Sequence, residues 1–185
     1  MHYTMTIAGL ERTLKIFPVD DELSIAALNL FGDVELAEAA GKALIAAAPA
    51  FDVILTPEAK SISLAHEMAK AAGMNDYVVA RKRKKVYMGK VVSSKTKSIT
   101  TAGEQELFLG EDDVAKLRGK RVLIVDDVVS TGGSLKSLEA LVAASEGSVA
   151  GKAFVLAEGA AVKRDDIIFL EPLPLFDAEG QPLPL

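Results

Sequence analysis

The residues best suited to chemistry are two adjacent acids and a small turn just after them. Asp126 and Asp127 follow the apolar run Val122–Val125, and the turn Ser130–Ser134 reads Ser-Thr-Gly-Gly-Ser. Its glycines let a ligand approach the backbone, and the free N-H groups of a helix that starts there attract an anion. Carboxylates accept hydrogen bonds from vicinal sugar hydroxyls. The segment therefore predicts a site for a ribose 5-phosphate.

An ordinary solvated turn is the alternative. The glycines alone fit that alternative equally well, because Gly-Gly turns before helices are common. The full order of apolar run, acid pair, hydroxyl-rich turn and helix favours the binding site. A Walker-type phosphate loop is disfavoured, since the chain has no Gly-x-x-x-x-Gly-Lys-Ser/Thr sequence.

The elements that position this segment follow an alternation of short apolar strand and amphipathic helix, which is typical of an α/β fold with a mostly parallel sheet flanked by helices. In such a sheet, ligands bind beyond the carboxyl ends of the strands, where the acid pair is expected. The predicted strands are Phe51–Thr56, Tyr77–Ala80, Arg121–Val125 and Lys152–Ala157, and the predicted helices are Asp33–Ala48, Ser61–Ala72 and Ser134–Ser145.

Two parts of the chain have a weaker pattern. From Arg81 to about Leu117 we expect a β-ribbon or a mobile arm, and from Ile167 through Phe176 an irregular, Pro-rich tail. The sequence has no internal repeat or linker, which predicts a single domain over residues 1–185.

Composition narrows the function classes. The formal charge of -5 and the pI near 5.1 give no general attraction for nucleic acid. The absence of cysteine excludes disulfides and thiolate sites, and two histidines are too few for a histidine-rich metal site. With no long apolar run and no signal-peptide pattern, the sequence predicts a cytoplasmic protein without membrane association.

The segment from Val122 to Ser134 resembles the motif of type I phosphoribosyltransferases that binds 5-phosphoribosyl-1-pyrophosphate (PRPP), and the resemblance extends from about Phe51 to Leu185. It implies that Asp126 and Asp127 contact the ribose hydroxyls as the catalytic acids. It further implies that PRPP is bound by both acids together with Val129, Ser130, Thr131, Gly132, Gly133 and Ser134.

Two further stretches resemble pyrophosphate-binding elements of purine phosphoribosyltransferases. The loop after the strand Phe51–Thr56 is similar to their Glu-Ser/Ala-x-Gly loop, with Ser61 where glycine is more usual, and a basic pair after the next strand resembles their Arg-Lys. The implied pyrophosphate-binding residues are Glu58, Ala59, Lys60, Ser61, Arg81 and Lys82. Solvated surface charges are the alternative for both stretches.

The family also implies a flexible arm and a small hood. Lys84–Glu106, with Tyr87 and the stretch Ser93–Thr101, resembles the arm that shields a carbocation-like transition state from water, although a structural hairpin remains open. The hood is expected from residues of about 158–185, with or without N-terminal residues. Its implied base-binding residues are Glu158, Gly159 and Phe176, while Phe169 and Phe176 could instead be core residues.

The resemblance implies a purine phosphoribosyltransferase that forms a nucleoside monophosphate and pyrophosphate from PRPP and a free base. Adenine is the leading base, because Gly159 stands where xanthine enzymes carry a lysine. The alternatives are a xanthine- or guanine-type enzyme and a noncatalytic PRPP-sensing regulator. Mg2+ is the expected cofactor, bound mainly through the substrate rather than by dedicated metal ligands, and a homodimer is expected.

Overall fold

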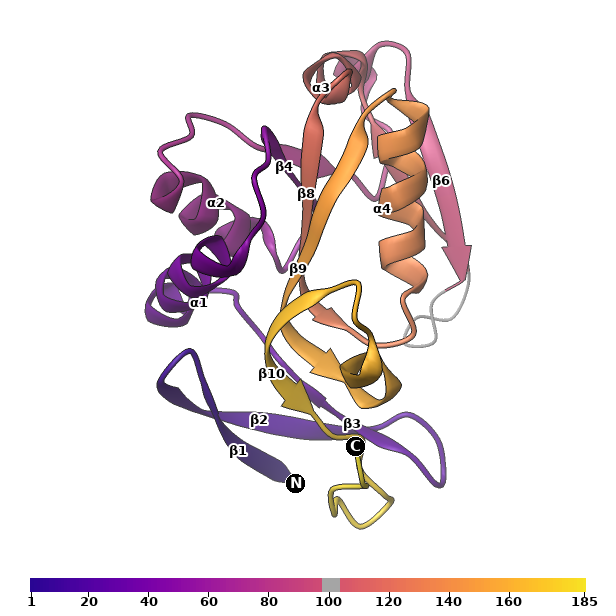
Figure 1. Cartoon of the computed structure of the whole chain (residues 1–185). Coiled ribbons are helices and arrows are strands. Elements are labelled where there is room, and N and C mark those ends of the chain that lie inside the picture. Colours follow the sequence, from indigo (N-terminus) through magenta and orange to yellow (C-terminus); the bar gives the residue numbers. More distant parts are fainter. Residues whose placement is uncertain (98–103) are drawn as a thin grey trace.

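A five-stranded parallel sheet forms the centre of the fold in the computed structural model, which describes residues 1–97 and 104–185. The strand order is β10-β9-β8-β4-β5 (Figure 1). The strands are β4 (Val53–Pro57), β5 (Val78–Ala80), β8 (Arg121–Val129), β9 (Ser148–Glu158) and β10 (Ile168–Leu173). Every pairing in this sheet is parallel. The predicted α/β architecture is therefore confirmed.

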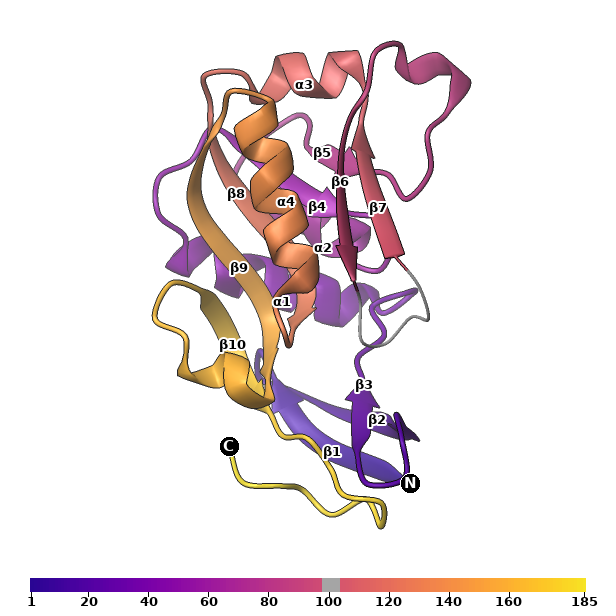
Figure 2. The same cartoon turned by 90° about the vertical axis from the view of Figure 1, so that its right-hand side faces the viewer.

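Helices cover both faces of this sheet, as its apolar strands require. The helices α1 (Val34–Ala47) and α2 (Ile62–Ala71) lie on one face, and α4 (Gly133–Ala144) lies on the other (Figures 1 and 2). The predicted cap of the first helix is confirmed, since the Asp33 side chain accepts a hydrogen bond from the Leu36 amide at 3.1 Å. In the described part of the chain, no helix is long and apolar enough to cross a membrane.

The strands β8 and β9 are longer than the sequence pattern predicts, and β10 was not expected. The strand β8 continues through both acids to Val129, because its second half pairs with β9 as far as Ala157. The acid pair therefore lies inside the carboxyl-terminal half of β8 rather than after it. The expected irregular tail forms β10 instead, which pairs with β9 and, as an edge strand, tolerates Pro172.

A two-stranded antiparallel ribbon follows β5, in agreement with the ribbon expected there. It consists of β6 (Val92–Lys97) and β7 (Glu104–Leu109), and a bridge from Phe108 to Arg81 attaches it beside β5. The ribbon ends earlier than expected, because α3 (Glu111–Leu117) is a helix with three acids in its first turn. Residues 98–103 of the expected arm lie outside the described residues.

The N-terminal residues form a separate antiparallel sheet of three strands, which we call the hood sheet. Its strands are β1 (His2–Ile7), β2 (Leu10–Pro18) and β3 (Ser24–Ala27), in the order β1-β2-β3. The C-terminal tail adds to it, since Ser24 and Phe176 form an antiparallel bridge. The hood is thus mainly N-terminal, where the sequence analysis gave the larger part to the C-terminal tail.

Candidate active site

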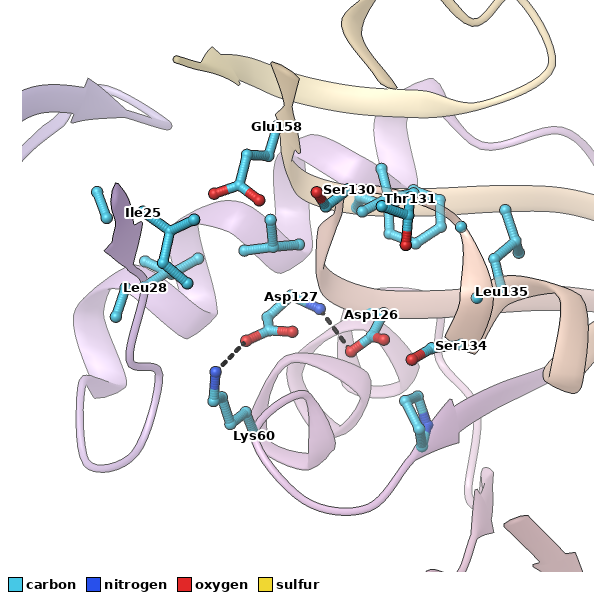
Figure 3. A pocket seen from close by; sticks show the side chains of 18 of the residues that line it. Ile25, Leu28, Lys60, Asp126, Asp127, Ser130, Thr131, Ser134, Leu135 and Glu158 are labelled. Carbon is cyan, nitrogen blue, oxygen red and sulfur yellow. Dashed lines mark hydrogen bonds and ion pairs between the residues drawn. The ribbon is translucent and has the colours of Figure 1, made fainter. Parts of the chain in front are cut away.

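A cavity of about 450 Å³ opens at the carboxyl edge of the parallel sheet, next to the hood sheet (Figure 3). It brings together segments that are far apart in the sequence: the hood, the loops after β4 and β5, the end of β8, the start of α4 and the end of β9. Its polar or conformationally special lining residues are Glu58, Lys60, Lys82, Asp126, Asp127, Ser130, Thr131, Gly132, Gly133, Ser134 and Glu158.

The start of α4 forms one end of this cavity. Gly132 caps the helix in the left-handed conformation with φ 79°, and its carbonyl accepts the first helical hydrogen bond from Lys136 at 3.0 Å. The N-H groups before Lys136 therefore have no partner within the helix, and they carry the positive end of its dipole. This end of the cavity suits a dianionic phosphate.

The acid pair lies beside this helix start. The Asp126 Oδ1 atom accepts a hydrogen bond from the Asp127 amide at 2.8 Å. Burial, and then the charge of Asp127, raise the pKa of Asp126 well above its ordinary value. Asp127 is 8% exposed, and within the described part of the chain its buried Oδ2 atom accepts no hydrogen bond. The pair thus presents acceptors that a hydroxyl-bearing ligand can satisfy.

Lys60 supplies a positive charge next to these acids. Its Nζ atom lies 3.5 Å from Asp127 Oδ2, and its side chain is half exposed (Figure 3). At that distance the contact is an ion pair rather than a hydrogen bond. The loop after β4 therefore places a half-exposed cation beside the acid pair.

Glu58 joins the loop after β4 to the loop after β5. Its Oε2 atom accepts a hydrogen bond from the Lys82 amide at 2.8 Å and lies 3.4 Å from Arg81 Nε. The Lys82 amide, followed by the Arg81 guanidinium, lowers the pKa of Glu58. The carboxylate is therefore engaged with protein groups, which makes it a positioning group for the two loops.

Not every predicted pyrophosphate-binding residue reaches the cavity. Ala59, Lys60 and Lys82 line it, whereas Arg81 lies outside the lining and donates a hydrogen bond to the Tyr87 hydroxyl at 3.1 Å. Ser61 is fully buried beneath the loop, where it accepts a hydrogen bond from Thr56 at 2.8 Å and donates one to the Pro57 carbonyl at 3.3 Å. It supports the loop from below.

Of the three predicted base-binding residues, only Glu158 reaches the cavity. It is 6% exposed, and burial raises the pKa of its carboxyl, opposed by a hydrogen bond from Ser130 and the charge of Lys60. A Cβ atom on Gly159 would stand 3.0 Å from Leu175, so this glycine lets Leu175 line the cavity. Phe176 is fully buried, with its ring 5.1 Å edge-on from Tyr3, and it belongs to the core between hood and sheet.

The apolar residues that line the cavity, many of them at the hood end, were not predicted from the sequence. Alternation of polar and apolar residues in Tyr3–Ile7 was the available signal for a strand. The β3 sequence Ser-Ile-Ala-Ala is too short to show such a pattern. The missed lining residues are Val19, Leu23, Ile25, Ala26, Ala27, Leu28, Pro57, Leu107, Val128, Leu135, Phe154 and Leu175.

Metal binding by protein groups alone finds little support. Among residues 1–97 and 104–185, no three His, Asp or Glu side chains gather as a metal centre would require. The unsatisfied Asp127 oxygen and the neighbouring Asp126 are oxygen donors of the kind that Mg2+ prefers. They fit a metal ion only if a ligand supplies most of the remaining oxygens.

Comparisons with known proteins point to one family. The chain is 34% identical over 122 residues to the adenine phosphoribosyltransferase of Thermotoga petrophila, a match covering 66% of this chain and 63% of that protein. A match to the enzyme of Oenococcus oeni is 33% identical over 123 residues and covers 66% of this chain and 67% of that protein. The chain thus matches slightly less than two thirds of the length of the first of these relatives.

Solved structures share the fold. The adenine phosphoribosyltransferase of Thermoanaerobacter pseudethanolicus has a TM-score of 0.68 at 24% identity, over 86% of this chain and 95% of that chain. The Saccharomyces cerevisiae enzyme, complexed with an imino-altritol bisphosphate and adenine, has a TM-score of 0.66 at 22% identity, over 85% and 92%. The phosphoribosyl transferase domain model matches residues 35–179, which include the sheet and all the polar residues of the cavity, and the chain belongs to this family.

Proposed function

We propose that this protein is an adenine phosphoribosyltransferase, which transfers the 5-phosphoribosyl group of PRPP to adenine and releases pyrophosphate. The observation that carries the proposal is the unsatisfied acid pair beside the open amino end of α4, in one cavity with an apolar hood. The named relatives support the choice of adenine.

The acid pair and the turn bind the ribose 5-phosphate. Asp126 and Asp127 accept hydrogen bonds from the two ribose hydroxyls, which gives the buried Asp127 Oδ2 atom the donor that it lacks. The backbone from Val129 through Ser134 surrounds the phosphate, and the Ser and Thr hydroxyls add donors. These contacts fix the anomeric carbon relative to the base, which is the main part of catalysis in such a displacement.

The pyrophosphate lies near the loops after β4 and β5. Lys60 and Lys82 face the cavity and neutralise part of the charge of pyrophosphate, while Glu58 holds the two loops together. Mg2+ is the proposed cofactor: Asp126 and Asp127 would lie beside it, the substrate would supply most of its ligands, and its positive charge would stabilise the leaving pyrophosphate. Arg81 is directed away, toward Tyr87, and in the proposed homodimer it serves the pyrophosphate of the partner subunit.

The base lies between the hood and the end of β9. Ile25 and Leu28 give it an apolar wall, and Glu158 is the charged group at that end of the cavity (Figure 3). When Glu158 is ionised, its carboxylate accepts hydrogen bonds only; in that form it pairs with the amino group of adenine and repels the oxygen of a 6-oxopurine. A xanthine- or guanine-type enzyme would need a donor at this place.

The predicted arm shields the reaction from water. A carbocation-like ribosyl group is captured by water unless the cavity is closed. The ribbon β6-β7 belongs to the expected arm, Lys84–Glu106, and we propose that this ribbon shields bound PRPP; residues 98–103 of the arm lie outside the described residues. We also place the activity in the cytoplasm, which the lack of cysteine fits.

A turnover assay tests the proposal. The protein is incubated with PRPP, Mg2+ and, in turn, adenine, guanine, hypoxanthine, xanthine, uracil and orotate, and pyrophosphate release is followed. We expect release with adenine at least about tenfold faster than with any other base. The control is the double variant Asp126→Asn with Asp127→Asn, which should bind PRPP weakly. PRPP binding without turnover of any base would identify a noncatalytic sensor and overturn the proposal.

A further inference from the structure

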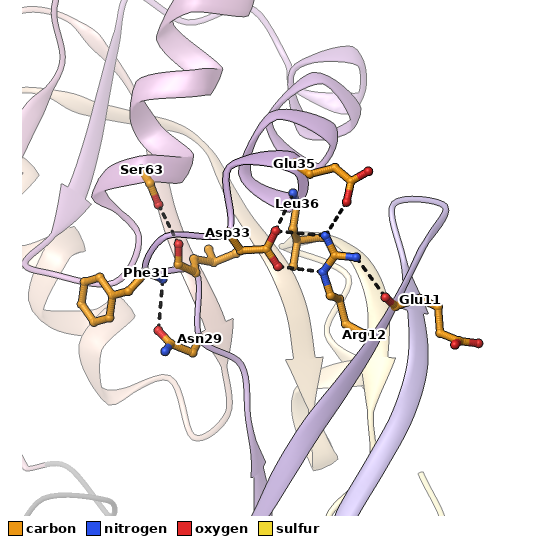
Figure 4. A network of polar contacts seen from close by, with 9 residues as sticks. Glu11, Arg12, Asn29, Phe31, Asp33, Glu35, Leu36 and Ser63 are labelled. Carbon is orange, nitrogen blue, oxygen red and sulfur yellow. Dashed lines mark hydrogen bonds and ion pairs between the residues drawn. The ribbon is translucent and has the colours of Figure 1, made fainter.

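One polar contact joins the hood sheet to the layer of helices. Arg12, on β2, donates from Nε to Asp33 Oδ2 at 2.7 Å and from Nη2 to Asp33 Oδ1 at 3.0 Å, so the guanidinium holds the carboxylate with both branches (Figure 4). Its Nη2 atom also contacts Glu35 Oε2 at 2.9 Å. The Arg12 and Asp33 side chains are 24% and 25% exposed. Paired geometry and partial shielding make such a contact more specific than a single surface ion pair.

The same strand holds the chain at a second point. Lys15, on β2, pairs with Ala27 of β3, and Arg12 lies three residues earlier on that strand. The chain leaves the hood sheet at Ala27 and enters α1 after Asp33. Both ends of the segment from residue 27 to residue 33 are therefore fixed to β2, one by backbone pairing and one by the ion pair.

Packing between this segment and β2 is incomplete. A second cavity of about 560 Å³ separates them, lined by Thr13, Leu14 and Phe17 of β2 and by Asn29 and Phe31 of the segment. The cavity lies to one side of the segment, whose residues Leu28 and Leu30 are buried in one core cluster with Leu14 of β2, so packing holds the middle of the segment. The ion pair lies beyond Leu30 and holds the far end of the segment to β2.

The segment forms part of the base end of the site. Ala27 and Leu28 line the main cavity, and Ile25 of β3 lies beside them. Asp33 also caps α1 through the Leu36 amide, and Arg12, followed by that amide, lowers the pKa of Asp33 despite an opposing effect of burial. The acid therefore remains ionised and keeps hood, segment and helix in one arrangement.

We infer that Arg12 and Asp33 are positioning residues for the base: their ion pair closes the segment 27–33 on β2 and so holds Leu28 and β3 against the bound base. This inference rests on the proposed function, because it assigns the hood end of the cavity to the base. Neither Arg12 nor Asp33 lines the main cavity, whereas Lys60 lines both cavities, so the Kd for PRPP must be measured beside the KM for adenine.

The kinetic test separates base binding from PRPP binding. Arg12→Gln removes the charge and the forked donor, and Asp33→Asn removes the ion pair while keeping a side chain that caps helices. For each variant we expect the KM for adenine to rise about three- to tenfold, with kcat and the Kd for PRPP within about twofold of wild type. The double variant should be no worse than the poorer single variant, and Arg12→Lys should recover part of the loss.

Two controls accompany these variants. Glu35→Gln removes only the exposed branch of the network, and Lys42→Gln breaks a surface pair with Glu38 within α1. Both should leave the KM for adenine unchanged. An unchanged KM in folded Arg12→Gln or Asp33→Asn overturns the inference, as does an equal loss of adenine and PRPP affinity, which indicates general destabilisation.

Hydrogen exchange tests the inference without turnover. In Arg12→Gln and Asp33→Asn, amides of residues 25–32 should exchange about threefold or more faster than in wild type, while those of the β8 core strand should not change. Should wild-type protein turn over no base, the proposed function fails on its own. Unchanged exchange in residues 25–32 would instead reject the positioning role.

Discussion

Gly132→Ala tests whether the amino end of α4 holds the phosphate. The residue has φ 79°, where an L side chain costs about 1–2 kcal/mol. A Cβ atom there would stand 3.0 Å from Arg164 Nη1, and Asp166 restrains that guanidinium through hydrogen bonds of 2.9 and 2.8 Å. We therefore expect a loss of about 1–2 kcal/mol, or a decrease in Tm of roughly 2–8 °C for a chain of this size.

The same substitution should weaken PRPP binding. Relaxing the strained backbone turns the N-H groups of the helix start away from the phosphate. Loss of one hydrogen bond to a charged group costs about 1.5–3 kcal/mol, so the Kd for PRPP should rise about tenfold or more. Tm is measured by calorimetric melting without ligand, and the Kd by titration calorimetry with PRPP and Mg2+.

Gly119→Ala is a matched control. Gly119 follows α3, has φ 69°, has no atom within 4 Å of a built Cβ and does not line the cavity. The Gly119→Ala variant introduces the same backbone strain, so Tm should fall by a similar amount while PRPP affinity stays at the wild-type value. If Gly132→Ala lost stability like Gly119→Ala and still bound PRPP normally, the turn would not be the phosphate site.

Three further predictions concern the acids and the ligand. Because the pKa of Asp126 is raised above 3.8, the folded state binds this proton more tightly, and stability should fall as pH rises from about 4 through the raised pKa. Asp126→Asn should remove that fall, so its ligand-free Tm at pH 7 should exceed that of wild type; an equal or lower Tm contradicts the raised pKa. Glu158→Gln, which adds a donor, should lower kcat/KM for adenine about tenfold and narrow the preference over hypoxanthine, and an unchanged ratio would remove Glu158 from base recognition. Ribose 5-phosphate should raise Tm more than inorganic phosphate at equal concentration in thermal melts, and equal shifts would show that the acids do not bind the sugar.

Local spacing was enough to predict which residues lie together at the acid end of the cavity. Asp126, Asp127 and the turn Ser130–Ser134 are neighbours in sequence, so their chemistry could be predicted without knowledge of the fold. The end of β8 could not be predicted in this way. Val129 remains in the strand because it pairs with Ala157, almost thirty residues later, and no local pattern records that pairing.

The hood end of the cavity depends on contacts that the sequence does not display. Ile25 and Leu28 reach the cavity because the hood sheet lies across the end of the central sheet. Phe176 has the aromatic side chain expected of a base-stacking residue, but its bridge to Ser24 and its contact with Tyr3 place it in the core. An aromatic residue in a tail is equally suited to either role until its partners are known.

The features that disfavour the ligand-free site are the ones that select its ligand. Two neighbouring acids, one of them with a buried oxygen that accepts no hydrogen bond, destabilise this cavity, and so do the unpartnered N-H groups at the start of α4. The hydroxyl groups of a ligand would donate hydrogen bonds to the acids, which relieves the first feature. An anion would accept hydrogen bonds from the free N-H groups of α4, which relieves the second. A phosphate alone or an uncharged sugar alone relieves only one of them. The proposed ligand, a sugar that carries its hydroxyls and its phosphate on one rigid frame, would relieve both at the entropic cost of binding a single molecule, and this would let an acidic chain bind an anion here without a general excess of positive charge.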